Sequence, residues 1–163
     1  MEPQPLPYEE YLGKIMDDLK SKNLGVLATS EGNRVTAREM VYVCNGKSFT
    51  FVTTIHTRKY HQIEANNQVA LSVGNVQIEG VAKIKGHPSK IENRWFVEAL
   101  PEQAKKLWYD LFLDPTRPET IIELAPKRMA LYFGAPDAHF DVLLMDEQKA
   151  LRYESLDRLI SYE

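Results

Sequence analysis

The sequence of 163 residues contains a single cysteine and no long hydrophobic run. With one cysteine, no disulfide can form within the chain and no cysteine-based zinc site can be built. No apolar stretch approaches the roughly 20 residues that a membrane-spanning helix needs. The N-terminus also lacks the basic start and apolar segment of a secretory signal. We therefore expect a cytoplasmic protein without a membrane partner, in which Cys44 is a small apolar strand residue.

The chain also has little net charge, since 20 Lys and Arg side chains face 23 Asp and Glu side chains, giving −3. This balance disfavours a dedicated nucleic-acid-binding protein. The charges are unevenly distributed, however: residues 34–59 carry five bases against one acid, whereas residues 137–163 carry seven acids against three bases. A locally basic segment in an acidic protein favours a small anionic ligand. The alternative, that these are ordinary solvated charges, stays open at this point.

Several catalytic motifs are missing. The chain has no glycine-rich phosphate loop, no dinucleotide-binding fingerprint and no Gly-x-Ser-x-Gly turn, which disfavours P-loop hydrolysis, Rossmann-type binding and serine hydrolysis. His56 and His61 are not spaced to share a helical face, so we expect no metal site. No nucleophile or general base is evident, and no catalytic residue can be named. This is typical of proteins in which a bound organic cofactor carries the chemistry.

Short strands and turns dominate residues 24–86, which we expect to form the core of a single domain over 1–163. The Asn45-Gly46 pair predicts a hairpin, and the strands follow one another too closely for helical crossovers. Such spacing favours a small antiparallel barrel or sandwich. The expected strands are 24–29, 35–43, 49–53, 69–73 and 76–85, and the expected helix is 57–67.

The flanking segments are predicted to be more helical. Apolar residues at helical spacing predict an N-terminal helix within 1–23. A helical insert within 87–118 is broken at Pro101, and its aromatic helices either pack on the core or cover a ligand. Closing strands and a C-terminal helix follow in 119–163. The expected elements of these segments are helices 91–100 and 103–112, strands 120–124, 128–133 and 140–145, and a terminal helix with Tyr153, Leu156, Leu159 and Ile160 on one face.

The stretch from Thr53 to Lys59 is the most informative for function. A strand ends in hydroxyl residues, and a helix then begins with Thr57 as its expected N-cap and with Arg58 and Lys59 in the first turn. The first turn of a helix has unpaired N–H groups and partial positive charge, so cations there cost about a few tenths of a kcal/mol each. N–H groups, hydroxyls and cations together suit a phosphate. Arg38 adds another charge if its strand lies beside this one.

The order of these residues resembles the pyridoxamine 5′-phosphate oxidase-like superfamily of FMN-binding split barrels. The match covers residues 24–86 and includes Arg38-Glu39-Met40-Val41, the Asn-Gly hairpin, and Thr53 followed by Thr57-Arg58-Lys59. It continues through His61-Gln62-Ile63-Glu64, Asn66-Asn67, Val69-Ala70-Leu71 and Gln77. The resemblance implies a mostly β fold, a six- to seven-stranded antiparallel split β-barrel with flanking α-helices.

The resemblance also implies a homodimer that binds FMN between its protomers. By matching position, Arg38, Thr57, Arg58 and Lys59 would hold the FMN phosphate. Val52 and Thr53 would lie along the flavin edge, and Gln77 would approach from the second protomer. Tyr132 or Phe133 would match a late aromatic residue near the flavin.

Some positions depart from the pattern of the true oxidases. Val52-Thr53 replaces a Tyr-Thr pair, Val43 replaces a lysine, and the C-terminal stretch is acidic instead of basic. The chain is therefore more similar to the general-stress and nitroimidazole-reductase-like members. The resemblance implies an FMN-dependent oxidoreductase that takes electrons from a nicotinamide-type donor and passes them to a small molecule. The alternatives are a non-catalytic flavin-binding or stress-sensing protein, or a relative that uses a deazaflavin or haem.

Overall fold

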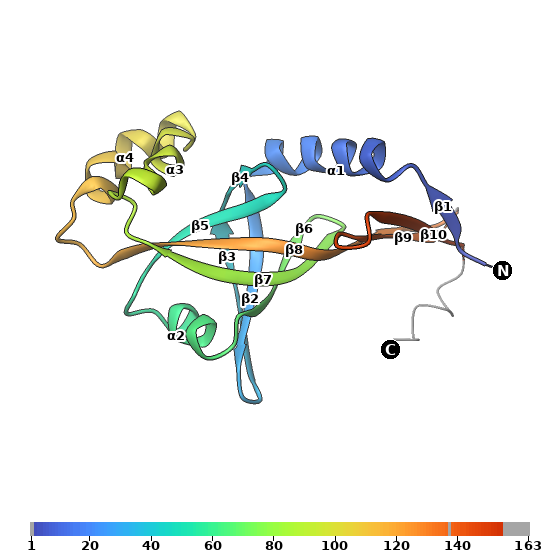
Figure 1. Cartoon of the computed structure of the whole chain (residues 1–163), viewed down its shortest axis with the longest axis horizontal. Coiled ribbons are helices and arrows are strands. Elements are labelled where there is room, and N and C mark those ends of the chain that lie inside the picture. The colour runs from blue at the N-terminus through green and yellow to red at the C-terminus, as the bar shows by residue number, and fades with distance from the viewer. Residues whose placement is uncertain (1, 137, 155–163) are drawn as a thin grey trace.

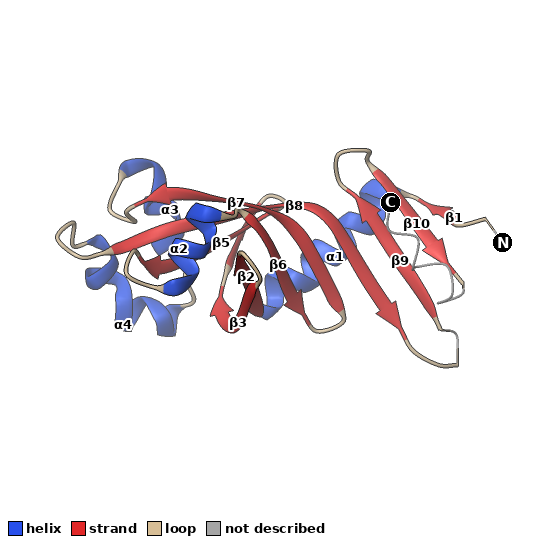
Figure 2. Cartoon of the chain, turned by 90° about the horizontal axis from the view of Figure 1, so that it is seen from below, coloured by secondary structure: helices blue, strands red, loops and turns tan. Residues whose placement is uncertain are grey.

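In the computed structural model, which describes residues 2–136 and 138–154, ten strands and four α-helices build the molecule (Figures 1 and 2). Figure 1 shows the α3–α4 pair at one end and β1, β9 and β10 at the other. The elements are β1 (Gln4–Leu6), α1 (Tyr8–Lys22), β2 (Leu24–Glu31), β3 (Arg34–Val41), β4 (Val43–Asn45), β5 (Ser48–Thr54), α2 (Arg58–Ala65), β6 (Gln68–Val73), β7 (Val76–Gly86), the 3-10 turn η1 (Ile91–Asn93), α3 (Arg94–Glu98), α4 (Glu102–Leu113), β8 (Glu119–Phe133), β9 (His139–Leu144) and β10 (Lys149–Tyr153).

The strands close into a ring because β3 and β4 are two halves of one segment, interrupted at Tyr42. β2 pairs with β3, β4 with β5, β5 with β8, β8 with β7, β7 with β6, and β6 with β2. All six pairings are antiparallel, so the expected mostly β split-barrel class is confirmed. β9, β10 and β1 continue the sheet from the second half of β8, outside the ring (Figure 2).

β8 is one strand, where the sequence predicted two. The expected strands were 120–124 and 128–133, but β8 runs for 15 residues and includes Pro126. The pairing of β7 with β8 shifts register between Glu79 and Gly80, and Gly80 lies opposite Pro126. A Cβ at Gly80 would lie 2.2 Å from the Ala125 carbonyl oxygen. Proline is tolerated at such an irregularity, and glycine permits the close approach of the two backbones.

The interior of the ring is apolar, and α1 packs against it. The predicted helix face of α1 is confirmed, since Leu12, Ile15, Met16 and Leu19 are all buried in the main core. Tyr42 is 1% exposed, and its hydroxyl donates to the Leu19 carbonyl at 2.6 Å. The strand residues of this core include Leu27, Phe49, Phe51, Leu71, Ile78, Leu124 and Met129.

Cys44 is half-buried in β4, as expected for a small apolar strand residue. Burial raises the pKa of its thiol to about 11. Since the thiolate is the reactive form of cysteine, this side chain is a poor nucleophile at neutral pH.

The helical insert packs on the outside of the ring and forms a second apolar cluster. Phe96, Val97 and Leu100 are buried there with Ile121 of β8. The expected helix 103–112 is present as α4, whereas the expected helix 91–100 is divided into the 3-10 turn η1 and the short helix α3, which ends before Pro101. Core packing therefore accounts for α3. α4 is less covered, and its Leu107 and Trp108 are 69% and 46% exposed.

Each end of the chain contains a strand that was not predicted. Residues 4–6, before α1, form β1, and Tyr153, expected in the terminal helix, lies in β10, which pairs with β1. β1 lies at the edge of the sheet, where Pro5 needs no ladder hydrogen bond. Leu156, Leu159 and Ile160 of the expected terminal helix lie outside the described residues. None of the helices described has the length and apolar character of a membrane span.

Candidate anion-binding site

Polar side chains gather where the start of α2 meets the ends of β2, β3 and β5. The helix lies on the side of the strands away from α1 (Figure 1). Its second turn is anchored to the β2–β3 hairpin by Gln62, which is 1% exposed. The residues that meet here are Thr29, Thr36, Arg38, Thr53, Thr57, Lys59 and Gln62.

Arg38 is half-buried, and the protein itself holds its guanidinium. Nη1 donates to the Leu27 carbonyl at 3.1 Å and to the Thr29 hydroxyl at 2.8 Å, while Nη2 donates to the Thr36 hydroxyl. The alternation of β3 places Arg38 and Thr36 on one face. The opposite, apolar face of β3 is the exposed one, with Val35 and Val41 68% and 46% exposed.

Lys59 is held by a separate chain of hydrogen bonds at the end of β5, and its charge is close enough to act on that of Arg38. Its Nζ donates to the Thr53 hydroxyl at 3.1 Å, and the Thr53 and Thr57 hydroxyls are 3.0 Å apart. Thr57 donates to the Thr54 carbonyl at 2.9 Å. Since that bond uses the Thr57 hydroxyl proton, the Thr53 hydroxyl is the donor between the two threonines.

Thr57 takes the expected N-cap position of α2, but its side chain does not cap the helix. The hydroxyl turns back to the end of β5 instead, so the predicted N-cap position is confirmed but the cap bond is not made. Neither Thr57 nor an acidic residue in the first turn compensates the partial positive charge of this helix end. The first-turn N–H groups of α2 are therefore left for water or for a ligand.

The site is positively charged. None of the ion pairs formed by the described residues includes Arg38, Arg58 or Lys59. Burial lowers the pKa of Arg38, and the nearby Arg58 lowers it further. Burial likewise lowers the pKa of Lys59, with an added contribution from Arg38. The three cations therefore repel one another and favour a bound anion.

Val52 and Gln77, the other two predicted site residues, lie apart from this polar cluster. The Val52 side chain packs on the cluster formed with α3 and α4. Gln77 is exposed on β7, and its amide donates to Glu79 at 2.8 Å. It pairs with Ala130, in the half of β8 that lies away from β5. The structure thus brings Arg38, Thr53, Thr57 and Lys59 together within one chain, with Arg58 beside them, but not Gln77.

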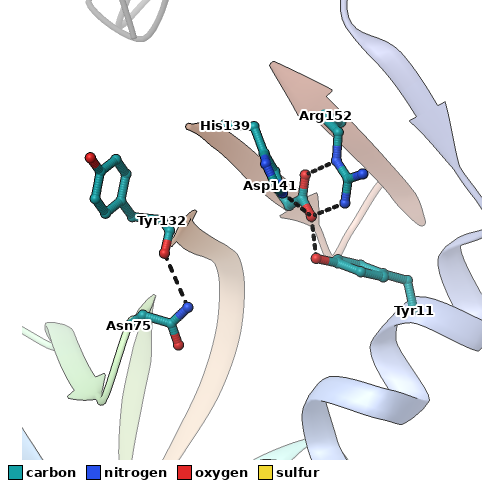
Figure 3. Close-up of polar contacts among 6 residues, drawn as sticks. All are labelled: Tyr11, Asn75, Tyr132, His139, Asp141 and Arg152. Atoms are coloured by element: carbon teal, nitrogen blue, oxygen red, sulfur yellow. Dashed lines mark hydrogen bonds and ion pairs between the residues drawn. The ribbon is translucent and has the colours of Figure 1, made fainter. Parts of the chain in front are cut away.

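A second polar cluster lies at the far end of the molecule and has a different character (Figure 3). Asp141 is 0% exposed, and Arg152 donates to both of its carboxylate oxygens at 2.8 Å. Tyr11 of α1 also donates to it, and His139 lies at 3.8 Å. Burial acts to raise the pKa of Asp141, but the bonds from Arg152 and Tyr11 outweigh it and lower the pKa. Because its charges are paired internally, this cluster fastens α1, β9 and β10 together.

The two predicted late aromatic residues lie near this second cluster. The Tyr132 ring is 44% exposed and lies 5.1 Å from that of Phe140. The backbone carbonyl of Tyr132 accepts a hydrogen bond from the Asn75 side chain at 3.1 Å (Figure 3). Phe133 instead stacks on His139 at 4.4 Å. Tyr132 is thus the more accessible of the pair.

The residues 12–133 match the family model described as pyridoxamine 5′-phosphate oxidase. No curated protein sequence matches the chain. A pyridoxamine 5′-phosphate oxidase-related, FMN-binding protein of Nostoc punctiforme is 14% identical, with a TM-score of 0.63 over 91% of this chain and 96% of that one. A Clostridium acetobutylicum protein related to general stress protein 26 is 19% identical, with a TM-score of 0.62 over 86% and 98%. A haem storage protein of Vibrio cholerae is 13% identical, with a TM-score of 0.60 over 73% and 92%. At these identities the likeness shows the shared fold, on which flavin and haem ligands both occur.

Proposed function

The chain belongs to the pyridoxamine 5′-phosphate oxidase family, and from this we propose that it binds FMN through the anion-binding site and acts as an oxidoreductase. The observation that carries the proposal is the half-buried, uncompensated pair Arg38 and Lys59. A phosphate monoester is a dianion with several acceptor oxygens, and it would relieve the repulsion between these cations. The FMN-binding relative with the same fold supports the choice of ligand.

The donors at the site fit such a phosphate. Three N–H groups of Arg38 are used within the protein, which leaves Nε–H and one Nη2–H. Lys59 donates one of its three N–H groups to the Thr53 hydroxyl, which leaves two for a ligand. Arg58 is exposed at the helix start, beside the uncapped N–H groups. Thr53 and Thr57 would act by holding Lys59 and the end of β5, since their own protons are already donated.

Bound FMN would supply the chemistry, because its ring accepts and releases electrons. We propose a nicotinamide-type donor and a small acceptor. The residues Val52 and Thr53 would lie along the ring edge through their backbone groups. Protein groups near the ring would tune it by hydrogen bonds and by the positive charge of the site.

A second copy of the chain would complete the site. The outer face of the β2–β3 hairpin is largely apolar and open: Leu24, Val26, Val35 and Val41 are 46%, 39%, 68% and 46% exposed, with the exposed Glu39 opposite Val26. This face is the back of the hairpin that carries Arg38, so a partner seated on it would lie next to the anion-binding site. Burial of such a face is the usual driving force for homodimers. The homodimer also gives a role to Gln77, which would reach the partner's FMN.

The Gln77→Ala variant tests that role. We expect FMN affinity to fall by only about 2- to 12-fold, because a neutral hydrogen bond is worth about 0.5–1.5 kcal/mol net. Flavin titration by fluorescence quenching measures the change. Ser72→Ala, at the exposed position opposite Gln77 on β6, is the matched control and should leave the affinity unchanged. A loss of several orders of magnitude would show that Gln77 has another role.

The proposed function is tested first by the absorption spectrum of the purified protein and by identification of the molecule released on denaturation. We expect a flavin spectrum, release of FMN, and loss of the flavin absorbance on anaerobic addition of NADH or NADPH, followed by recovery with an acceptor. Retained FMN that no nicotinamide reduces would indicate a non-catalytic flavin-binding protein. A Soret band, or release of a deazaflavin, would contradict the choice of FMN.

A further inference from the structure

A closed ring of hydrogen bonds joins Arg38 to the buried amide of Gln62. Arg38 donates to the hydroxyls of Thr29 and Thr36. Both hydroxyls in turn donate to Gln62 Oε1, each at 2.7 Å. Each threonine thus accepts from the guanidinium and passes its own proton to the amide oxygen, so neither hydroxyl is free to rotate.

The orientation of the Gln62 amide is fixed by a third strand group. Its Nε2 donates to the Arg34 carbonyl at 3.1 Å. Exchanging the amide oxygen and nitrogen would set the oxygen against that carbonyl and remove the acceptor that both threonines use. With Gln62 1% exposed, water cannot replace these partners, so a lost bond leaves a buried polar group unsatisfied.

We propose that Gln62 is a positioning residue that aims Arg38 at the phosphate of FMN, through the hydroxyls of Thr29 and Thr36. The ring uses the inner side of the guanidinium and leaves Nε–H and one Nη2–H for a ligand. Because Gln62 and Lys59 lie on the same short helix, the ring also fixes the helix that carries the second cation against the hairpin that carries the first. This inference rests on the proposed function, since it assigns a role within the same site.

Phosphate recognition can be separated from flavin binding by comparing FMN with riboflavin, which lacks the phosphate. The measured quantity is the ratio of the two dissociation constants for each variant. Gln62→Met removes the acceptor and the donor at similar volume. We expect it to weaken FMN binding by about tenfold and to leave riboflavin binding within about twofold. Thr36→Val, which breaks one arm of the ring at a less buried position, should give a smaller loss in the same direction.

The matched control is Asn66→Ala. Asn66 makes another link from α2 to β2, donating to Ser30 at 2.9 Å, and Ser30 is not one of the hydrogen-bond partners of Arg38. It should lower the melting temperature without changing the ratio of FMN to riboflavin affinity. In addition, Arg38→Gln should lose the FMN preference. Adding Gln62→Met to Arg38→Gln should reduce the FMN affinity little further, because the guanidinium that Gln62 positions is then absent.

The outcomes separate the two proposals. A wild-type protein that binds FMN and riboflavin equally would overturn the phosphate site itself. If the wild-type protein prefers FMN and Arg38→Gln loses that preference, but Gln62→Met and Thr36→Val keep it, only the positioning role is overturned. Parallel loss of FMN and riboflavin affinity in Gln62→Met would assign Gln62 a purely structural role. Should Gln62→Met not fold, Thr36→Val decides between these results.

Discussion

The double variant Arg58→Ala/Lys59→Glu should bind FMN about a thousandfold more weakly than the wild-type protein. Hydrogen bonds to charged groups are worth about 1.5–3 kcal/mol each, and every 1.4 kcal/mol changes an affinity by about tenfold. The variant removes one cation from the start of α2 and reverses another that lies beside Arg38. Flavin titration measures the affinity, and circular dichroism verifies that the fold is retained.

A control with the same change of net charge isolates the site from the overall charge. Lys83→Ala/Lys106→Glu alters two exposed lysines outside the anion-binding site. It should bind FMN as the wild-type protein does, apart from a small effect that salt screens. Unchanged FMN affinity in a folded Arg58→Ala/Lys59→Glu protein would show that the phosphate binds elsewhere.

The second large effect concerns stability and the far cluster of Figure 3. Asp141→Asn leaves Arg152 without its buried counter-charge, and breaking a buried ion pair costs about 3–5 kcal/mol. For a chain of this size each kcal/mol shifts the melting temperature by about 2–4 °C, so we expect a drop of about 6–20 °C. Thermal unfolding followed by circular dichroism measures it. Asp146→Asn, which breaks the exposed pair with Lys127, should cost less than about 1 kcal/mol.

The Asp141–Arg152 pair also predicts that the stability of the fold depends on pH. The pKa of Asp141 is lowered from its usual value of 3.8, so the folded state holds the carboxylate charged more strongly than the unfolded state. The stabilisation is therefore fully present above pH 3.8 and is lost as pH falls through the lowered pKa. Unfolding in urea across this range should show the advantage of the wild-type protein over Asp141→Asn shrinking in acid. A constant difference at all pH values would contradict the assignment.

Much of the fold could be predicted from local patterns, but the joins between strands could not. Alternation and the Asn45-Gly46 turn predicted the hairpins, since both are properties of neighbouring residues. The continuity of β8 through Pro126 depends on Gly80, a partner more than forty residues away in the sequence. The strands β1 and β10 likewise form by pairing the two ends of the chain, which no local pattern reveals.

For the candidate site, the cations could be predicted and the groups that hold them could not. Charge spacing and helix-end physics pointed to Arg38, Arg58 and Lys59. Thr57 takes the predicted N-cap position, but the direction of its hydroxyl, toward the Thr54 carbonyl, could not be predicted from the sequence. Gln62 carries no charge and follows from no helix-end argument, so only the resemblance includes it. Its position next to the buried Ile63 was the available signal, because a polar side chain on the buried face of a helix requires partners.

The repulsion between Arg38 and Lys59 has a consequence for protein engineering. A thermal-stability screen of the protein without its ligand would reward substitutions that discharge Lys59, since burial and the nearby Arg38 disfavour its charge in the folded chain. Such a screen would enrich Lys59→Met early and would erase binding in the same step. Selection for heat resistance should therefore be run with FMN present. The positive charge that destabilises the free protein but is proposed to bind the phosphate is then retained.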